Sequence, residues 1–293
     1  MMFSLIVSTL DRVDELERLL ASLDAQTCTE FEVIVVDQNA DSRLDAVLQR
    51  HPELRLRHLR SERGLSRGRN AGLRACAGAI VTFPDDDCCY PSDLLASIVR
   101  WFAEHPEYHG LLTGCRNLEG QPMAPKFPPR EGECDKRSIL RCAIAWNLFL
   151  RREAAEAVGF FREDIGVGAA SPFQSGEDLD YPIRALERGF RLWYAPGLTV
   201  YHPQLNSRAR LDRITYGYAM GLGRVWRMHR YPWTFCLGEV AFRSLGGALF
   251  NLCKADFHAS RAYLVRAAGQ LRGYMQPIAD GMRSQGTRAV GKP

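Results

Sequence analysis

The first 105 residues alternate between short apolar runs and amphipathic segments, and this alternation limits the possible folds more than any other feature. Residues 3–9 (FSLIVST) and 31–39 (FEVIVVDQN) are rich in β-branched residues, as expected of strands covered on both faces. Between them, residues 12–26 place a stripe of apolar side chains on one helical face: Val13, Leu16, Leu19, Leu20 and Leu23. Repeated strand–helix units predict a parallel, doubly wound sheet.

The same reasoning extends along the chain, with helices predicted at 42–52, 64–78, 91–106 and 178–190 and strands at 54–59, 79–87 and 191–203, the last as one or two strands. Ser92 is the expected N-cap of the helix at 91–106. A strand and a short helix are expected within 145–161, between a proline-rich loop and a Gly/Ser-rich loop. Tyr-, Gly- and Arg-rich helices are expected after residue 203.

Composition places the chain among globular proteins, since 46% of its residues are hydrophobic and 25% are charged. Nine cysteines without a CxxC pair indicate reduced thiols that serve mainly in packing. The first residues lack the basic segment of a signal peptide, and no apolar run reaches the roughly 18 residues of a spanning helix. A cytoplasmic location is therefore expected.

Acidic residues lie at the ends of three of the predicted strands: Asp11 just after the first, Asp37 near the end of the second, and the triplet Asp85, Asp86 and Asp87 at the end of the fourth. In open α/β sheets, ligands bind outside the carboxyl ends of the strands. Converging carboxylates need a cation to stay ionised together, and oxygen ligands favour Mg²⁺ or Mn²⁺ bound with phosphates. The alternative is a solvated turn in which Asp87 or Asp93 caps the next helix.

Arginines and glycines alternate in the predicted helix at 64–78 and just before it: Arg63, Gly64, Arg67, Gly68, Arg69 and Gly72. Arginine suits contacts to phosphate and ribose, and glycine permits close backbone approach. The segment is neither a P-loop nor a dinucleotide-binding GxGxxG motif. Ordinary tight packing of a solvated helix is the alternative.

Two further sites are candidates for chemistry. Glu177 and Asp178 open a predicted helix, where carboxylates are stabilised by the helix dipole. The Gly-rich sequence before them favours a cleft, in which Asp178 could accept a proton from a hydroxyl. His202 follows the last predicted strand, so a role beside metal or phosphate stands against a purely structural one.

Taken in order, the segments IVST, VIVVDQN, RGRNAGL, IVTFPDDD, GEDLDYPIRALERGF and VYHP resemble family 2 glycosyltransferases over residues 3–203. The resemblance implies an α/β GT-A fold, a Rossmann-like, mostly parallel sheet with helices on both faces. It divides the chain into a glycosyltransferase domain (1–203) and a basic helical region (204–293). The halves 1–115 and 116–203 would bind the nucleotide sugar and the acceptor.

The resemblance also implies roles for individual residues. The donor would contact Thr9, Asp11, Asp37, Arg69, Asn70, Asp85 and Asp86, whereas Asp87, Asp85 and His202 would hold Mn²⁺ or Mg²⁺. Asp178 would be the general base and Glu177 would bind the acceptor or orient that base. The segments STLDR and VVDQNA depart from the family's commoner sequences, which weakens the match of the base contacts around Thr9 and Asp41.

The implied reaction is transfer, with inversion, from a UDP-, GDP- or dTDP-sugar to a glycan, a lipid-linked molecule or another hydroxyl acceptor, as in polysaccharide or glycoconjugate biosynthesis. Bond cleavage places charge on the diphosphate, and a divalent cation stabilises that charge. A sugar-phosphate nucleotidyltransferase is the closest rival, although such enzymes carry a glycine-rich, lysine-containing loop after the first strand. A non-catalytic module that binds sugar nucleotides or glycans is the other alternative.

From Gln204 onward the chain has 14 Lys or Arg residues against 4 Asp or Glu residues, although its overall net charge is only +4. One interpretation is a helical cap that packs on the sheet and shapes the acceptor site. The other is an amphipathic surface on an anionic membrane, which makes the protein peripheral to it. Nucleic acid is not expected as a partner, because the sequence contains no recognition module.

Overall fold

The computed structural model describes residues 3–123, 127–203 and 211–277. The chain forms two compact units, which share the helix that begins at Glu177. Of the described residues, those within 3–161 and 181–203 belong to the first unit, and those within 162–180 and 211–277 belong to the second. The segment 162–180, predicted as part of the first domain, thus groups with the C-terminal helices.

An eight-stranded sheet with the order β3-β2-β1-β4-β7-β5-β8-β6 forms the first unit. The strands are β1 (Phe3–Thr9), β2 (Phe31–Asp37), β3 (Leu56–Arg60), β4 (Ile80–Thr82), β5 (Gly110–Arg116), β6 (Gly132–Glu133), β7 (Leu148–Arg151) and β8 (Leu192–Tyr201). The strands β3, β2, β1 and β4 are parallel, as are β5 and β8, while β7 and β6 run antiparallel to their neighbours. The α/β fold with a mostly parallel sheet is confirmed.

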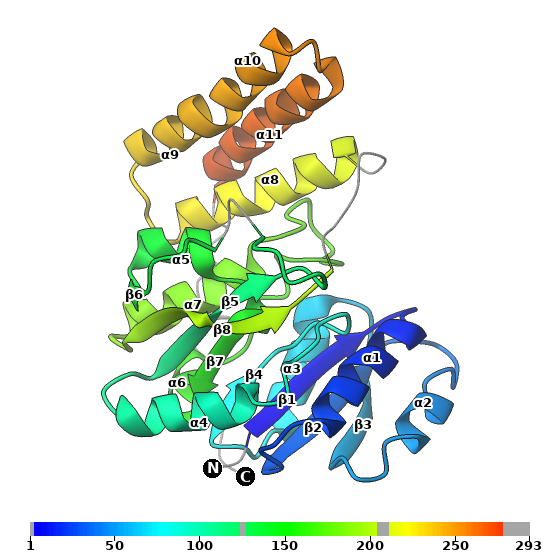
Figure 1. The fold of residues 1–293 in the computed structure, drawn as a ribbon. Coiled ribbons are helices and arrows are strands. Elements are labelled where there is room, and N and C mark those ends of the chain that lie inside the picture. The colour runs from blue at the N-terminus through cyan, green and yellow to red at the C-terminus, as the bar shows by residue number, and fades with distance from the viewer. Residues whose placement is uncertain (1–2, 124–126, 204–210, 278–293) are drawn as a thin grey trace. The chain divides into compact units, whose positions relative to one another are not determined.

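Helices cover both faces of this sheet (Figure 1). They are α1 (Val13–Asp24), α2 (Asp45–Gln49), α3 (Leu65–Ala75), α4 (Leu94–Glu104), α5 (Lys136–Cys142), α6 (Arg152–Val158) and α7 (Glu177–Glu187), with a 3₁₀ turn at Ala145–Asn147. The helix α4 begins at Leu94 after Asp93, which makes no side-chain cap bond. The predicted Ser92 cap is therefore wrong.

Two glycines of α3 let this helix lie directly on β1. A Cβ at Gly72 would lie 2.2 Å from Cγ2 of Ile6, and one at Gly68 would lie 2.4 Å from Oγ of Ser8. Neither position has room for a side chain. The glycines serve helix–sheet packing, which is the alternative to the phosphate contact predicted for them.

The second unit contains α8 (Leu211–Met228), α9 (Trp233–Glu239), the π-helix η2 (Val240–Leu245), α10 (Gly246–Cys253) and α11 (Phe257–Met275). Small residues bring α8 and α11 together, since a Cβ at Gly223 would lie 2.1 Å from the Gln270 carbonyl oxygen. A Cβ at Gly273 would lie equally close, 2.1 Å, to the Met220 carbonyl oxygen. Within the described ranges, no helix has the length and apolarity needed to cross a membrane.

Candidate active site

The aspartate triplet follows β4 in a turn that is fixed to two other strands. Asp85 forms a parallel bridge with Ser8 near the end of β1. Cys89 exchanges two backbone hydrogen bonds with Tyr201 at the end of β8, at 2.8 and 2.9 Å. The ends of β1, β4 and β8 therefore meet here, and His202 lies beside the triplet.

Each carboxylate of the triplet has a cationic neighbour in the first unit. The pairs are Arg69 Nη2 with Asp85 Oδ1 (3.0 Å), Arg12 Nη1 with Asp86 Oδ1 (3.0 Å) and with Asp87 Oδ2, and His202 Nε2 with Asp87 Oδ1 (3.0 Å) and Asp85 Oδ2 (4.0 Å). These side chains offset the repulsion that the sequence alone led us to assign to a bound cation. Arg12 was not predicted, and its only sequence signal is its place three residues after the end of β1.

The carboxyl groups of Asp86 and Asp87 differ in acidity because their surroundings differ. Burial raises the pKa of Asp86 to about 7, although the Arg12 charge and a Thr9 hydrogen bond act in the opposite direction. Burial also acts to raise the pKa of Asp87, but His202 and Arg12 outweigh it and lower that pKa to about 2. Asp87 is consequently ionised at neutral pH, as a metal ligand must be.

Asp87, Cys88 and His202 offer potential ligand atoms within 4.8 Å of one another. Burial raises the pKa of the Cys88 thiol well above its usual range, so the thiol stays protonated and is a poor ligand. The Asp87 and Asp85 oxygens and the His202 imidazole suit Mn²⁺ or Mg²⁺ better. Trp146 stacks on His202 at 5.2 Å and 15°, which fixes the plane of the imidazole.

Thr9 and Asp11 lie at the end of β1 in different environments. Thr9 is buried, and its hydroxyl hydrogen-bonds Asp86 and lies 3.4 Å from the Arg12 carbonyl oxygen. The Asp11 side chain is 57% exposed, and its carboxylate pairs with Arg43 at 2.7 Å. Both residues belong to the same sheet edge as the triplet, and Asp11 is open to a ligand.

Asp37 is the last residue of β2, as predicted, and lies in the interior. Its side chain is fully buried, and its Oδ1 accepts two hydrogen bonds of 2.8 Å from Asn39. Its Oδ2 lies 3.0 Å from both His58 Nε2 and Arg60 Nη1. Asp37 is the register partner of Thr9 on β1, and its bonds to Asn39 support the loop after β2.

Asn70 is also buried, and both ends of its amide bind one residue of the backbone. Its Nδ2 donates to the Phe161 carbonyl at 3.0 Å, and its Oδ1 accepts from the Phe161 N–H at 2.7 Å. The neighbouring Arg69 guanidinium lies over the Phe161 ring, 5.3 Å from its centroid. Asn70 therefore fixes the chain after α6.

We expect Asn70→Ala to lower the free energy of unfolding by about 2–4 kcal/mol, because it leaves a buried N–H and a buried carbonyl without partners. Chemical denaturation followed by circular dichroism measures this loss. Arg67→Ala, on the same helix but paired with the exposed Glu62, is the matched control and should change stability by less than about 0.5 kcal/mol. A stable Asn70→Ala protein with weakened nucleotide binding would instead indicate a direct donor contact.

The first turn of α7 belongs to the second unit and carries three acidic residues. Glu177 is buried, Asp178 is partly buried, and buried Asp180 lies 3.0 Å from His229 Nε2 of α8. Gly166 lies against Glu177, since a Cβ there would be 2.8 Å from its carboxyl carbon. Packing on both sides thus fixes this turn, and the Asp180–His229 pair was not predicted.

The rest of α7, from Tyr181 onward, belongs to the first unit. The Tyr181 hydroxyl donates to the Gly159 carbonyl at 3.0 Å, and its ring stacks on Phe161 at 4.0 Å. Tyr181 also contacts Phe83, which lies two residues before the aspartate triplet, with ring centroids 5.6 Å apart. Asp178 therefore belongs to a helix whose next turn is fixed by aromatic packing.

Comparison with known proteins gives a consistent family. The family described as glycosyl transferase family 2 matches residues 4–159. An uncharacterized glycosyltransferase of Haemophilus influenzae is 32% identical over 194 residues, which cover 64% of this chain and 62% of the relative. A PGL/p-HBAD biosynthesis glycosyltransferase of Mycobacterium bovis is 33% identical over 36% of this chain and 43% of the relative. The chain thus spans less than two thirds of the length of these relatives.

Solved structures show the same fold at low sequence identity. The mannosyltransferase PcManGT of Pyrobaculum calidifontis, in complex with GDP-Man and Mn²⁺, has a TM-score of 0.62 at 18% identity and covers 92% of this chain and 86% of its own. Residues 1–349 of S. aureus TarS, in complex with UDP-GlcNAc, have a TM-score of 0.59 at 18% identity over 96% and 95% of the two chains. The GT-A fold predicted from the sequence is confirmed.

Proposed function

The chain belongs to glycosyl transferase family 2, and from this we propose that it transfers a sugar from a nucleoside-diphosphate sugar to an acceptor hydroxyl, with inversion. The observation that carries the proposal is the cluster of Asp85, Asp86, Asp87 and His202 at the ends of three strands of a GT-A sheet. The fully ionised Asp87 beside an oriented imidazole suits a divalent cation. When bound, Mn²⁺ or Mg²⁺ would stabilise the charge that develops on the diphosphate.

In this proposal the residues at the strand ends have different roles. Asp87, Asp85 and His202 hold the cation, while Asp86, Thr9 and Asp11 contact the donor. Arg69 stays paired with Asp85 and orients it. Arg12 would exchange its carboxylate contacts for the donor diphosphate, because an arginine beside a phosphate gains charge-assisted hydrogen bonds. The buried Asp37 and Asn70 serve the scaffold.

Asp178 is the proposed general base, and Glu177 orients it or binds the acceptor. The support is its position in the family's Glu-Asp pair and the fixed first turn of α7. A carboxylate that accepts the hydroxyl proton makes the acceptor oxygen a better nucleophile. Attack on the face opposite the diphosphate then gives inversion in one displacement.

The proposal includes a reducing, cytoplasmic location, which the nine free thiols support.

The proposal is tested with a panel of UDP-, GDP- and dTDP-sugars, with and without Mn²⁺. We expect one donor class to raise the melting temperature by several degrees only when the metal is present, because ligand binding to the native state stabilises it. The same donor should be slowly hydrolysed.

Other outcomes would favour the alternative functions. Donor binding with neither transfer nor hydrolysis would favour a binding module. Pyrophosphate release from a sugar phosphate and a nucleoside triphosphate would favour a nucleotidyltransferase. Only Leu10–Arg12 connect β1 to α1, which leaves little room for that enzyme's loop.

A further inference from the structure

The segment Trp233–Met275, here called the C-terminal hairpin, exposes large apolar side chains. It folds as α9, η2 and α10 packed against α11. Between 45% and 84% of each of the following residues is exposed: Trp233, Leu237, Phe242, Leu245, Leu249, Phe250, Leu252, Phe257, Leu264 and Met275. Most of the exposed large apolar residues of the described chain thus belong to this hairpin.

The side chains inside the hairpin are, by contrast, small or polar. Cys236, Val240, Ser244 and Ala248 form a buried line at four-residue spacing. Across the hairpin, the Ser244 hydroxyl donates to Oε1 of Gln270 at 2.9 Å, and the Ser260 hydroxyl donates to the Ala248 carbonyl at 2.9 Å. The interior is therefore held by small side chains and hydrogen bonds.

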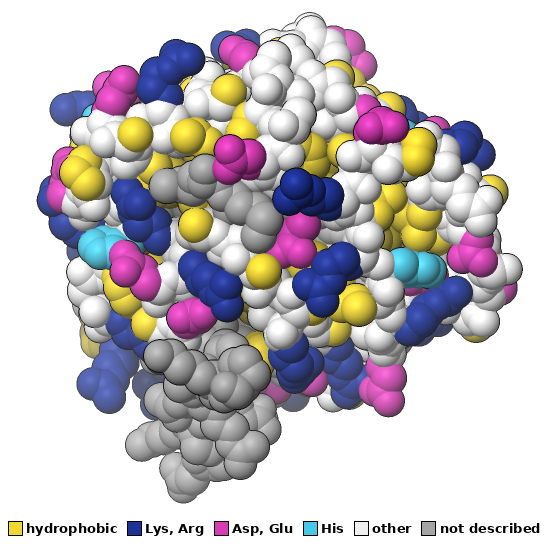
Figure 2. Space-filling model, turned by 90° about the horizontal axis from the view of Figure 1, so that it is seen from below, with side chains coloured by type: hydrophobic (Ala, Val, Ile, Leu, Met, Phe, Trp, Pro, Cys, Tyr) yellow, Lys and Arg dark blue, Asp and Glu magenta, His cyan; other side chains and the backbone are white. Residues whose placement is uncertain are grey.

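This pattern is the reverse of what water favours. A helix in water buries its large apolar face and exposes polar residues, whereas helices in lipid pack through small residues and polar contacts and turn large apolar side chains outward. The face of the molecule in Figure 2 shows the arrangement usual in water, with acidic and basic side chains interspersed among small apolar areas. The hairpin surface differs because it exposes many large apolar side chains.

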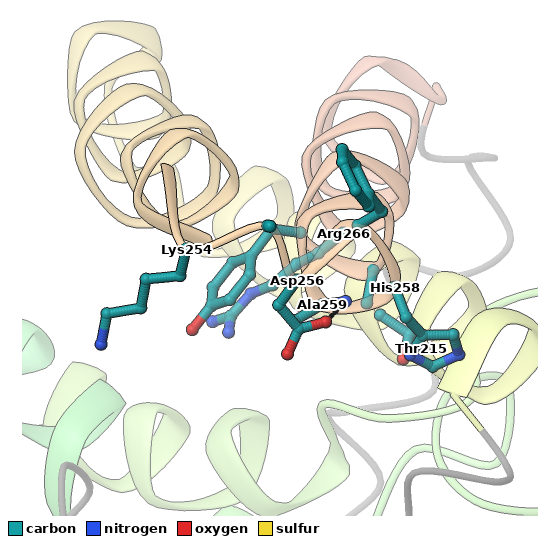
Figure 3. Close-up of a pocket in the computed structure, with 10 residues that line it drawn as sticks. Thr215, Lys254, Asp256, His258, Ala259 and Arg266 are labelled. Carbon is teal, nitrogen blue, oxygen red and sulfur yellow. Dashed lines mark hydrogen bonds between the residues drawn. The ribbon is translucent and has the colours of Figure 1, made fainter. Parts of the chain in front are cut away.

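Cationic groups lie next to this apolar surface. Between residues 233 and 277 the chain has five Lys or Arg residues against two Asp or Glu residues. A cavity of about 880 Å³ at the α10–α11 turn is lined by Lys254, His258 and Arg266, together with Asp256 (Figure 3). Asp256 accepts from the Ala259 N–H at 3.0 Å and so caps α11. Burial lowers the pKa of Arg266, and an anion in the cavity would stabilise its charge.

We propose that the C-terminal hairpin docks on an anionic membrane surface, with its exposed Trp, Phe and Leu side chains among the acyl chains and lipid phosphates beside Lys254 and Arg266. A basic amphipathic helix with aromatic and leucine side chains on its apolar face binds anionic bilayers in this way. Glu239 and Arg243 form an ion pair of 3.0 Å within the first half of the hairpin, Trp233–Cys253. Charges are costly in hydrocarbon, so this ion pair keeps that half of the hairpin at the membrane–water interface.

The test uses the full-length protein with vesicles of phosphatidylcholine and phosphatidylglycerol, and with vesicles of phosphatidylcholine alone. Of the five tryptophans, Trp233 is 63% exposed, Trp101 and Trp193 of the first unit are partly buried, and Trp146 and Trp226 are 2% exposed. Only Trp233 lies in the hairpin, so docking should shift the emission to shorter wavelength mainly through Trp233. Co-sedimentation should show binding that is stronger to the anionic vesicles and weaker at high salt. The shift should be lost in Trp233→Phe.

Matched variants separate docking through the hairpin from nonspecific adsorption of the protein to vesicles. Phe242→Ser with Leu249→Ser should weaken vesicle binding at least about tenfold, because two inserted side chains are lost. Lys254→Gln with Arg266→Gln should weaken binding to anionic vesicles about tenfold and leave binding to neutral vesicles unchanged. Leu118→Ser, at a 48% exposed leucine of the first unit, should bind like the wild type.

Two outcomes would overturn the inference. One is wild-type protein that does not sediment with anionic vesicles. The other is a lipid-free dimer in sedimentation velocity that Phe242→Ser with Leu249→Ser converts to monomer while vesicle binding is unchanged, because the hairpin would then be the interface with a second copy. None of these measurements depends on glycosyl transfer.

Discussion

Asp178→Asn should reduce the transfer rate roughly 10²–10⁴-fold and leave the affinity for the donor nearly unchanged. The asparagine keeps the shape of the side chain and cannot accept the acceptor proton, and general-base catalysis contributes about that factor. The rate is measured as diphosphate release with saturating donor and acceptor. Donor affinity is measured by calorimetry in the presence of Mn²⁺.

The control for this variant is Glu187→Gln, at the other end of α7, where the carboxylate pairs with Lys136 on the surface. It should leave the rate within about a factor of two, because exposed ion pairs contribute little. If Asp178→Asn turned over at the wild-type rate, the base would have to be another residue. If both donor affinity and melting temperature fell, Asp178 would instead support the fold of the α7 turn.

Asp87→Asn should weaken Mn²⁺-dependent donor binding at least about 100-fold, since removing an anionic ligand costs a bound divalent cation several kcal/mol. The amide is a neutral ligand and no longer balances Arg12 and His202. Titration of the donor with Mn²⁺ and with a chelator gives the metal-dependent part. In the chelator, wild type and variant should bind the donor equally weakly.

Asp93→Asn is the control from the same connection between β4 and α4, because Asp93 is exposed and makes no cap bond. It should bind donor and metal like the wild type. Circular dichroism without metal establishes that Asp87→Asn is folded. Unchanged metal dependence in a folded Asp87→Asn protein would remove Asp87 from the metal site and leave the turn as a structural feature.

Local pattern was enough to predict most of the fold. The apolar periodicity predicted α1, α3, α4 and α7 to within a few residues, because a helix or strand records which of its own faces is buried. The strand ends placed Asp85–Asp87 and His202 at one rim before any contact was known. Pattern did not predict the antiparallel β7 in the middle of the sheet, since pairing direction depends on residues far apart in the chain.

The hydrogen-bond and ion-pair partners of the predicted site residues could not be predicted from the sequence pattern. Arg12 and Asp86 are 74 residues apart, and Asn70 and Phe161 are 91 residues apart. The sequence alone suggested that the clustered carboxylates require a metal, whereas the structure supplies arginine and histidine partners for them. The polar atoms of Asp37 and Asn70 are bonded in the interior, and for this reason we propose a scaffold role for both residues, although the sequence predicted donor contacts.

The sequence by itself determined the α/β class, most of the strands and helices, and the positions of the acidic residues at the strand ends, since these follow from local spacing. It did not predict the central strand β5 or the short strand β6. Only the tertiary structure decided which charges meet and which faces stay open. In the C-terminal hairpin, spacing shows that the helices are amphipathic but not which face packs. Gly247 packs under the Tyr263 ring and Gly269 packs against Tyr216 and Ala219 of α8, so small residues face inward and the large apolar side chains stay outside.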